Sequence, residues 1–172
     1  DKIKYPLLFK PIKLIFHRGD YVVAGFDKSK DQFMTINVSK IKEYELTKIS
    51  FPKKKLLELG NNELQNRFGI TNNINRKNYI IKLEFSSFTG EFISHYHWHD
   101  SQKFYQLENG NWILQMECGI NRELIGWLFM WMSNVRILAP LTLKQVFLDQ
   151  LKNINDIYKI ESNLKYKNVF VQ

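Results

Sequence analysis

The sequence predicts an α+β protein with two modules, a small β-barrel followed by a ferredoxin-like module. Three observations lead to this prediction. Short strand-like runs separated by polar turns fill residues 1–51, a pattern typical of small barrels and sandwiches. After a polar stretch at residues 71–78, strand-like and helix-like patterns alternate. The chain has 172 residues, of which 44% are hydrophobic and 24% charged, as expected for a globular protein.

The first module, residues 1–51, is rich in β-branched and aromatic residues that lie between turn signals. Polar turns at residues 17–20 and 27–31 divide it. The expected strands are residues 6–16, 21–26, 33–38 and 41–49. A core made by so few residues is small, so this module needs support from the rest of the chain.

Residues 52–77 are expected to connect the two modules. Pro52 ends the strand-like pattern, and three lysines then precede an apolar series that finishes near Gly69. Residues 71–78 are polar and rich in turn-forming asparagine. The connector is therefore predicted to be a helix or loop followed by a linker.

The second module, residues 78–160, follows the order strand, helix, strand, strand, helix, strand, helix. This order is the split βαβ, or ferredoxin-like, arrangement. The expected strands are residues 78–85, 99–107, 112–118 and 135–138, and the expected helices are residues 86–96, 121–132 and 142–158. Asn109-Gly110 is a strong hairpin signal, and Asn121 and Thr142 are expected helix caps. Residues 161–172 are expected to form a C-terminal tail.

The charge of the chain is concentrated in its first third. The formal net charge is +8, and residues 1–55 hold 13 basic and 6 acidic side chains, a net +7. A basic surface favours an anionic partner such as nucleic acid, a nucleotide or phosphate. The alternative is a solvated lysine-rich face without a partner.

Several functional classes are not expected. No apolar run approaches the roughly 20 residues that cross a bilayer, and no signal peptide is visible. The single cysteine, Cys118, excludes a disulfide within the chain and favours a cytoplasmic setting. Because the sequence begins at Asp1 rather than methionine, we expect a fragment or a processed chain. Cys118 has no neighbouring base, and there is no phosphate loop, nucleophile elbow or spaced carboxylate pair. Neither an enzyme nor a cofactor is therefore expected, and the Asp and Glu residues are expected at the surface.

Residues in both modules are spaced as in a known family. In the first module the matching residues are Pro11, Leu14, Gly19, Ala24, Asp27 and Ile41. In the second they are Phe68-Gly69-Ile70, His99, Gln102, Asn109-Gly110, Glu123-Leu124, Trp127-Leu128, residues 135–140 and Tyr158. With these residues, the stretch 9–41 resembles the core of the WYL domain, and the second module resembles the WCX extension that follows it.

The resemblance implies a bacterial transcription regulator. Such proteins carry an N-terminal helix-turn-helix, then an SH3-like or Sm-like WYL barrel and a WCX extension. No helix-turn-helix is readable before Asp1, and we expect the barrel to lack its usual first strand. The barrel would bind a nucleotide or single-stranded nucleic acid as effector. The effector would control the binding of duplex DNA by a homodimer, through the missing N-terminal domain.

The candidate ligand site is a polar set on the barrel, namely Lys13, His17, Tyr21, Asn37 and Lys40. Strand periodicity places Lys13 and His17 on one face. With Lys40 they would surround an anion, and Tyr21 would stack on a base. The alternative is that Lys13 and His17 face solvent and Tyr21 belongs to the core.

The sequence also departs from the family pattern. The Trp-Tyr-Leu signature falls on Tyr21-Val22-Val23, and the two arginines of the late strand fall on Asn37 and Lys40. A guanidinium binds phosphate through a rigid fork, whereas lysine is a point charge and asparagine is neutral. Phosphate recognition is therefore expected to be reduced or altered.

Two other functions stay open. The first is a dimerisation or interaction module with a vestigial pocket, in which the aromatic and methionine-rich residues 127–132 form the interface. The alternative for those residues is a helix packed on the sheet. The second is a metal-dependent enzyme built on His95, His97 and His99, since imidazoles bind zinc or nickel. No cysteine or carboxylate cluster completes that shell nearby in sequence.

Overall fold

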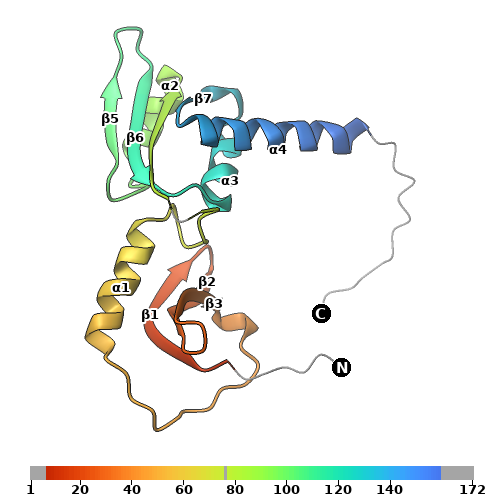
Figure 1. The fold of residues 1–172 in the computed structure, drawn as a ribbon. Coiled ribbons are helices and arrows are strands. Elements are labelled where there is room, and N and C mark those ends of the chain that lie inside the picture. Colours follow the sequence, from red (N-terminus) through yellow and green to blue (C-terminus); the bar gives the residue numbers. More distant parts are fainter. Residues whose placement is uncertain (1–6, 76, 160–172) are drawn as a thin grey trace.

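The computed structural model describes residues 7–75 and 77–159, which form two modules placed end to end (Figure 1). The first module is a three-stranded antiparallel sheet, and the second contains a four-stranded antiparallel sheet. The helix α1 (Lys53–Gln65) leads from the first module to the second. The mixed α and β content that the sequence predicts is confirmed.

The first sheet has the strand order β1-β2-β3. Its strands are β1 (Phe9–His17), β2 (Asp20–Asp27) and β3 (Gln32–Asn37). Alternate residues of β2 are buried and point toward α1, as period two requires for a sheet with one covered face. The core of this module is small and consists of Ile12, Ala24, Phe26, Phe33 and Leu56.

The expected fourth strand, residues 41–49, is wrong, and the predicted barrel is not closed. After the short 3-10 helix η1 (Val38–Lys40), the chain runs without regular structure around the outer end of the module to α1 (Figure 1). The side chains of Tyr44 and Leu46 are 86% and 88% exposed. The alternation in this segment finds no neighbouring strand among the described residues, and three strands are too few to close a barrel.

Helix α1 covers the inner face of the first sheet. Gly60 lies against that face, where an added Cβ would come within 3.2 Å of the Phe33 ring and would overlap the side chain of Ile12. Glycine at this position therefore allows a close approach of helix to sheet. The far end of α1 is in contact with the second module.

The second sheet has the strand order β5-β6-β4-β7. Its strands are β4 (Tyr79–Phe85), β5 (Lys103–Gln106), β6 (Trp112–Cys118) and β7 (Val135–Ala139). Its helices are α2 (Ser87–Ser94), α3 (Arg122–Met130) and α4 (Leu141–Lys159), with a 3-10 helix η2 (Met132–Asn134) after α3. Every strand and helix expected here is present, although several ends differ.

Three of these differences have local causes. Strand β5 begins at Lys103 rather than residue 99, because the Gln102 side chain accepts the N–H groups of Trp98 and His99 and holds a turn there. Helix α4 begins at Leu141, so Thr142 lies in its first turn and is not its cap. The expected cap Asn121 is confirmed, since its side chain accepts the N–H of Leu124 at 3.0 Å.

The larger core lies between the second sheet and helices α2 and α3. Its fully buried members include Ile81, Leu83, Phe85, Ile93, Leu114, Leu124 and Leu128. In the part of the chain that the structure describes, no helix has the length and apolar character needed to cross a membrane. The expected C-terminal tail and residue 160 lie outside the described residues.

Candidate functional site at the junction of the modules

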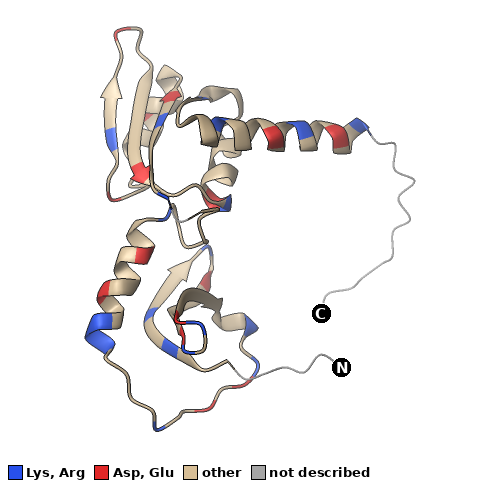
Figure 2. Cartoon of the chain, viewed as in Figure 1, with Lys and Arg blue, Asp and Glu red and all other residues tan. Residues whose placement is uncertain are grey.

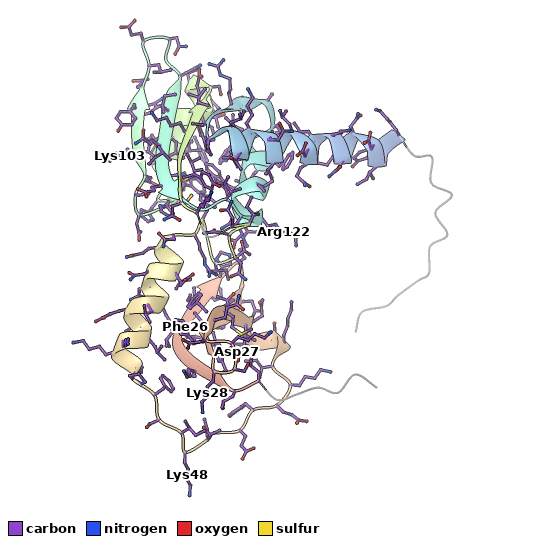
Figure 3. The ribbon with its side chains drawn as sticks, in the orientation of Figure 1. Phe26, Asp27, Lys28, Lys48, Lys103 and Arg122 are labelled. Atoms are coloured by element: carbon purple, nitrogen blue, oxygen red, sulfur yellow. The ribbon has the colours of Figure 1, made fainter. Side chains whose placement is uncertain are left out.

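The tip of the β1–β2 hairpin is the part of the first module that contacts α3. Arg18 and Gly19 form its two-residue turn with φ angles of 50° and 84°, as expected for a type I′ turn. His17 pairs with Asp20 across the turn. This geometry places His17 and Arg18 at the very end of the hairpin, next to the start of α3. Arg122 is labelled there in Figure 3.

The carboxylate of Glu123, in the first turn of α3, contacts the side chains of His17 and Arg18. Its Oε2 atom lies 2.7 Å from His17 Nε2 and 3.4 Å from the Arg18 guanidinium. An ionised carboxylate only accepts hydrogen bonds, so the His17 Nε2 atom carries the hydrogen. Glu123 is only 6% exposed, although it was expected at the surface with the other acidic residues.

The connector supplies the remaining partners of this carboxylate. The N–H groups of Ile70 and Thr71 donate to Glu123 Oε1 at 2.9 and 2.8 Å. Burial by itself raises the pKa of Glu123, but these two hydrogen bonds and the His17 side chain more than offset it and hold the pKa below its usual value. The group is therefore a buried, ionised carboxylate that joins three segments of the chain.

Gly69 makes this arrangement possible. Its φ angle is +75°, in the left-handed region that favours glycine. An added Cβ would lie 2.6 Å from the carboxyl carbon of Glu123. Both the backbone conformation and the position of the carboxylate therefore require glycine.

The C-terminal end of α1 forms a second tie between the modules. His99 donates from Nε2 to the carbonyl of Gln65 at 3.0 Å, while its Nδ1 accepts the N–H of Ser101 at 3.2 Å. Burial lowers the pKa of His99 below its usual value, which keeps the ring neutral at neutral pH. The N–H of Gly119 donates to the carbonyl of Asn66 at 2.8 Å. The end of α1 is thus fixed to the second module through its backbone.

Arg67, just after α1, packs back on the first module. Its guanidinium lies 4.8 Å from the centre of the Phe33 ring and donates to the carbonyl of Ile70 at 3.2 Å. The next residue, Phe68, belongs to the core of the second module. Consecutive residues of the connector are therefore anchored in different modules.

A pocket of about 310 Å³ lies beside this junction. Its lining comes from β1, from one face of α1 and from the turn before β5. The lining residues are Lys13, Asn61, Leu64, Gln65 and Asp100. The pocket is mostly polar and takes residues from both modules, so a molecule bound in it touches both.

The structure does not bring the five predicted site residues together. Lys13 and His17 lie on the same face of β1, as predicted, because they pair with Ala24 and Asp20 of β2. Lys13 lines the pocket, whereas His17 binds Glu123.

The other three predicted residues do not join Lys13 in the pocket, although Asn37 pairs with Val22 and so lies on the same face of the sheet as Lys13 and His17. Tyr21 pairs with Phe16 on the opposite face of the sheet, where it is half exposed and not part of the core. Asn37 donates to Asp20 Oδ2 at 3.0 Å, and the exposed Lys40 lies in the nearby helix η1. One anion therefore does not contact all five side chains in this arrangement.

The histidine cluster does not assemble. His99 is buried in the junction, while His95 and His97 are exposed. Among residues 7–75 and 77–159, no three His, Cys, Asp or Glu side chains are placed to hold a metal ion. Burial raises the pKa of the Cys118 thiol to about 12, so this thiol is not a nucleophile near neutral pH.

The two tryptophans of the stretch 127–132 pack on the sheet, while Met132 is exposed. Trp127 and Leu128 belong to the core, and the Trp127 ring lies 5.2 Å from that of Phe68 and 5.1 Å from that of Trp98. Met130, at the end of α3, is exposed. The packed-helix interpretation is therefore confirmed for most of this stretch.

Sequence comparison finds one family model that matches the second module. Residues 77–154 match the model of the WCX domain family, a stretch that covers less than half of the chain. This match confirms the resemblance of the second module to a WCX extension. The WYL resemblance of residues 9–41 stays a prediction.

Among the solved structures that are similar to this chain, one matches a larger share of it than the WCX family does. It is proteasome accessory factor B/C (PafBC) of Arthrobacter aurescens, with 14% identity and a TM-score of 0.40 over 87% of this chain. The chain spans 22% of the length of PafBC. A likeness this weak carries no functional conclusion. No curated protein matches the chain.

Proposed function

We propose that this chain is the effector-sensing, C-terminal part of a bacterial DNA-binding transcription regulator. The observation that carries the proposal is the polar pocket, because residues of both modules line it beside a junction held by specific hydrogen bonds. The WCX match over residues 77–154 and the WYL resemblance of residues 9–41 supply the class of protein. The effector is a nucleotide or single-stranded nucleic acid.

The chemistry of the pocket fits such an effector. Lys13 supplies a positive charge for a phosphate at one side of the pocket, while the Asp100 carboxylate at the other side accepts hydrogen bonds from groups such as base amino groups. Asn61 and Gln65 lie four residues apart on one face of α1, and their amides donate and accept hydrogen bonds, as base edges require. The volume of about 310 Å³ lies at the lower end of the range for small-molecule sites. Lys53, Lys54 and Lys55 add positive charge at the other end of α1 (Figure 2).

The mechanism is a population shift. Lys13 belongs to the first module and Asp100 to the second, while the Gln65 backbone is held by His99. An effector that fits one arrangement of the modules better than another changes the proportion of the two. In the whole regulator this changes the placement of DNA-binding domains in a homodimer, and hence operator binding.

We also propose a specific fold type for each module. The strand order β5-β6-β4-β7 and the strand-helix alternation support a ferredoxin-like second module. The first sheet corresponds to part of an SH3-like or Sm-like barrel. In this account the chain is cytoplasmic, has no cofactor and catalyses no reaction.

The test is the binding of a fluorescein-labelled single-stranded oligonucleotide to the chain and to two variants. Lys13→Ala should weaken binding about tenfold or more, the usual effect of removing a hydrogen bond to a charged group. Tyr21→Ala is the matched control, because Tyr21 lies on the opposite face of the same sheet. Equal affinity of Lys13→Ala and the unmodified chain contradicts the proposed pocket.

A dimerisation module is the second candidate, and α4 is the observation that favours it. Beyond its first turns this helix extends away from the body of the second module (Figure 1). Apolar residues continue along one side at helical spacing and are exposed, namely Leu151, Ile154, Ile157 and Tyr158. Sedimentation of the chain and of a Leu151→Glu, Ile154→Glu variant tests this function, which requires a dimer that the variant loses.

A further inference from the structure

We propose that this chain has a second anion-binding site, at the tip of the β1–β2 hairpin, which the carboxylate of Glu123 fills in this structure. A phosphate group of the effector displaces that carboxylate when the effector binds. The inference rests on the proposed function, since it concerns the same anionic effector. It adds a competition between the effector and the chain's own side chain.

The donors of this site lie outside the element that supplies the carboxylate. The Ile70 and Thr71 N–H groups belong to the connector, and His17 and Arg18 belong to the hairpin. Their distances to the nearest carboxylate oxygen are 2.9, 2.8, 2.7 and 3.4 Å. Only the occupant comes from α3. The donors therefore form an anion site by themselves, and the carboxylate is one anion that fits it.

The backbone of the connector has the form of an anion-binding nest. Gly69 has a left-handed φ of +75°, and the N–H groups of the next two residues both point at one carboxylate oxygen. Successive N–H groups in such a turn make a concave site for anions. The absence of a side chain at residue 69 leaves the space that the anion occupies.

One of the two residues whose N–H groups bind the carboxylate also has a hydroxyl without a partner in the described part of the chain. The Thr71 hydroxyl is buried and has no hydrogen-bond partner among the described residues. A buried polar group without a partner is rare in native structures. Glu123 Oε1 accepts two N–H groups and Oε2 accepts His17, while Arg18 only pairs with Oε2 as an ion pair at 3.4 Å. A phosphate has more oxygens than a carboxylate and can accept this additional donor.

The site is open to solvent on one side and is aligned with the pocket. The Arg18 side chain is 66% exposed, so an anion reaches it without unfolding of the junction. Lys13 and His17 are four residues apart on one face of β1, which corresponds to about 13 Å. An effector with phosphates at that separation contacts both sites. The class that fits is a short single-stranded oligonucleotide rather than a mononucleotide.

Displacement of Glu123 would break the tie between the hairpin and α3. The ties at the end of α1, between His99 and Gln65 and between Gly119 and Asn66, would remain. The first module would then be free to turn about the end of α1. This is how occupancy of the hairpin site reaches the second module.

The experiment is a titration with inorganic phosphate, followed through the backbone amide NMR signals of Ile70 and Thr71. Glu123→Gln keeps an oxygen acceptor for those amides but removes the competing charge. We expect this variant to bind phosphate at least about tenfold more tightly than the unmodified chain. Glu117→Gln, at an exposed position on β6, is the matched control and should bind like the unmodified chain.

A second substitution in the Glu123→Gln variant tests whether phosphate binds at the hairpin. Arg18→Ala in the Glu123→Gln background should abolish the gain in affinity. Equal phosphate affinity of Glu123→Gln and the unmodified chain overturns the inference, as do shifts confined to the lining of the pocket. If Glu123→Gln does not fold, as judged by exposure of Cys118 to a thiol reagent, the unmodified chain decides the question. Phosphate must then shift its Ile70 and Thr71 signals, and unchanged signals overturn the inference.

This outcome is separate from that of the proposed function. One result is oligonucleotide binding that depends on Lys13 while phosphate leaves the Ile70 and Thr71 amide signals unchanged. That result supports the proposed function and contradicts the hairpin site. Phosphate binding at the hairpin without oligonucleotide binding supports the hairpin site and contradicts the proposed oligonucleotide effector.

Discussion

Replacement of Gly69 by alanine should destabilise the second module far more than an ordinary glycine replacement. The left-handed backbone at Gly69 costs an alanine about 1–2 kcal/mol. The new methyl group would also lie 2.6 Å from the carboxyl carbon of Glu123 and push this side chain off its donors. Leaving the buried Glu123 carboxylate without its donors costs up to about 3–5 kcal/mol. The expected loss is therefore up to about 4–7 kcal/mol in the free energy of unfolding.

The assay is urea unfolding followed by tryptophan fluorescence, because all four tryptophans lie in the second module. Gly110→Ala is the matched control. Gly110 has a similar φ of +83°, but the nearest atom to an added Cβ is 3.6 Å away, so only the backbone cost of about 1–2 kcal/mol applies.

A double-mutant cycle isolates the contact with Glu123. In a Glu123→Ala background the carboxylate is gone, and Gly69→Ala should cost no more than Gly110→Ala. Equal destabilisation by Gly69→Ala and Gly110→Ala in the unmodified chain would refute a clash with Glu123. A larger cost of Gly69→Ala than of Gly110→Ala in the Glu123→Ala background would refute it as well.

Three further predictions follow from other residues. Gly126→Ala should raise the free energy of unfolding by about 0.5–1 kcal/mol in urea titrations, because Gly126 lies in α3 with open space around it; a loss of stability contradicts this. The lowered pKa of buried His99 means that stability is lost as pH falls from about 6.5 through the lower folded value. Between pH 7.5 and 5.5, the free energy of unfolding in urea should therefore fall less for His99→Gln than for the unmodified chain. Equal losses of stability in the two proteins would refute this role of His99. Cys118, with its pKa raised to about 12, should react with a thiol reagent only as the second module unfolds; rapid labelling of the folded chain contradicts its burial.

Local signals predicted most of the secondary structure correctly. The turn at Arg18-Gly19, the Asn109-Gly110 hairpin and the cap at Asn121 depend on backbone preferences of a few adjacent residues. The alternation over residues 41–49 failed as a strand signal because strand formation requires a neighbouring strand. That requirement is set by the arrangement of the whole module and not by the segment.

The site was less predictable because it depends on long-range pairs. The common face of Lys13 and His17 follows from period two and is confirmed. The position of Tyr21 on the other face follows only from the register of β1 and β2. Glu123 is separated from His17 by 106 residues, and nothing local distinguishes it from an exposed acidic residue of a helix start. The available signals were a glutamate in the first turn of α3 and the turn-forming Gly69. Neither one alone predicts a buried carboxylate, because the site forms only when the fold brings the two residues together.

The measurement that tests the central claim most directly is oligonucleotide binding by the unmodified chain across a salt series. We expect the logarithm of the affinity to fall linearly with the logarithm of salt concentration, with a slope that reports the number of phosphates engaged. Lys13→Ala should bind more weakly and reduce the magnitude of that slope by about one. Absence of binding at low salt, or an unchanged affinity and slope in Lys13→Ala, would contradict an anionic effector in the pocket between the modules.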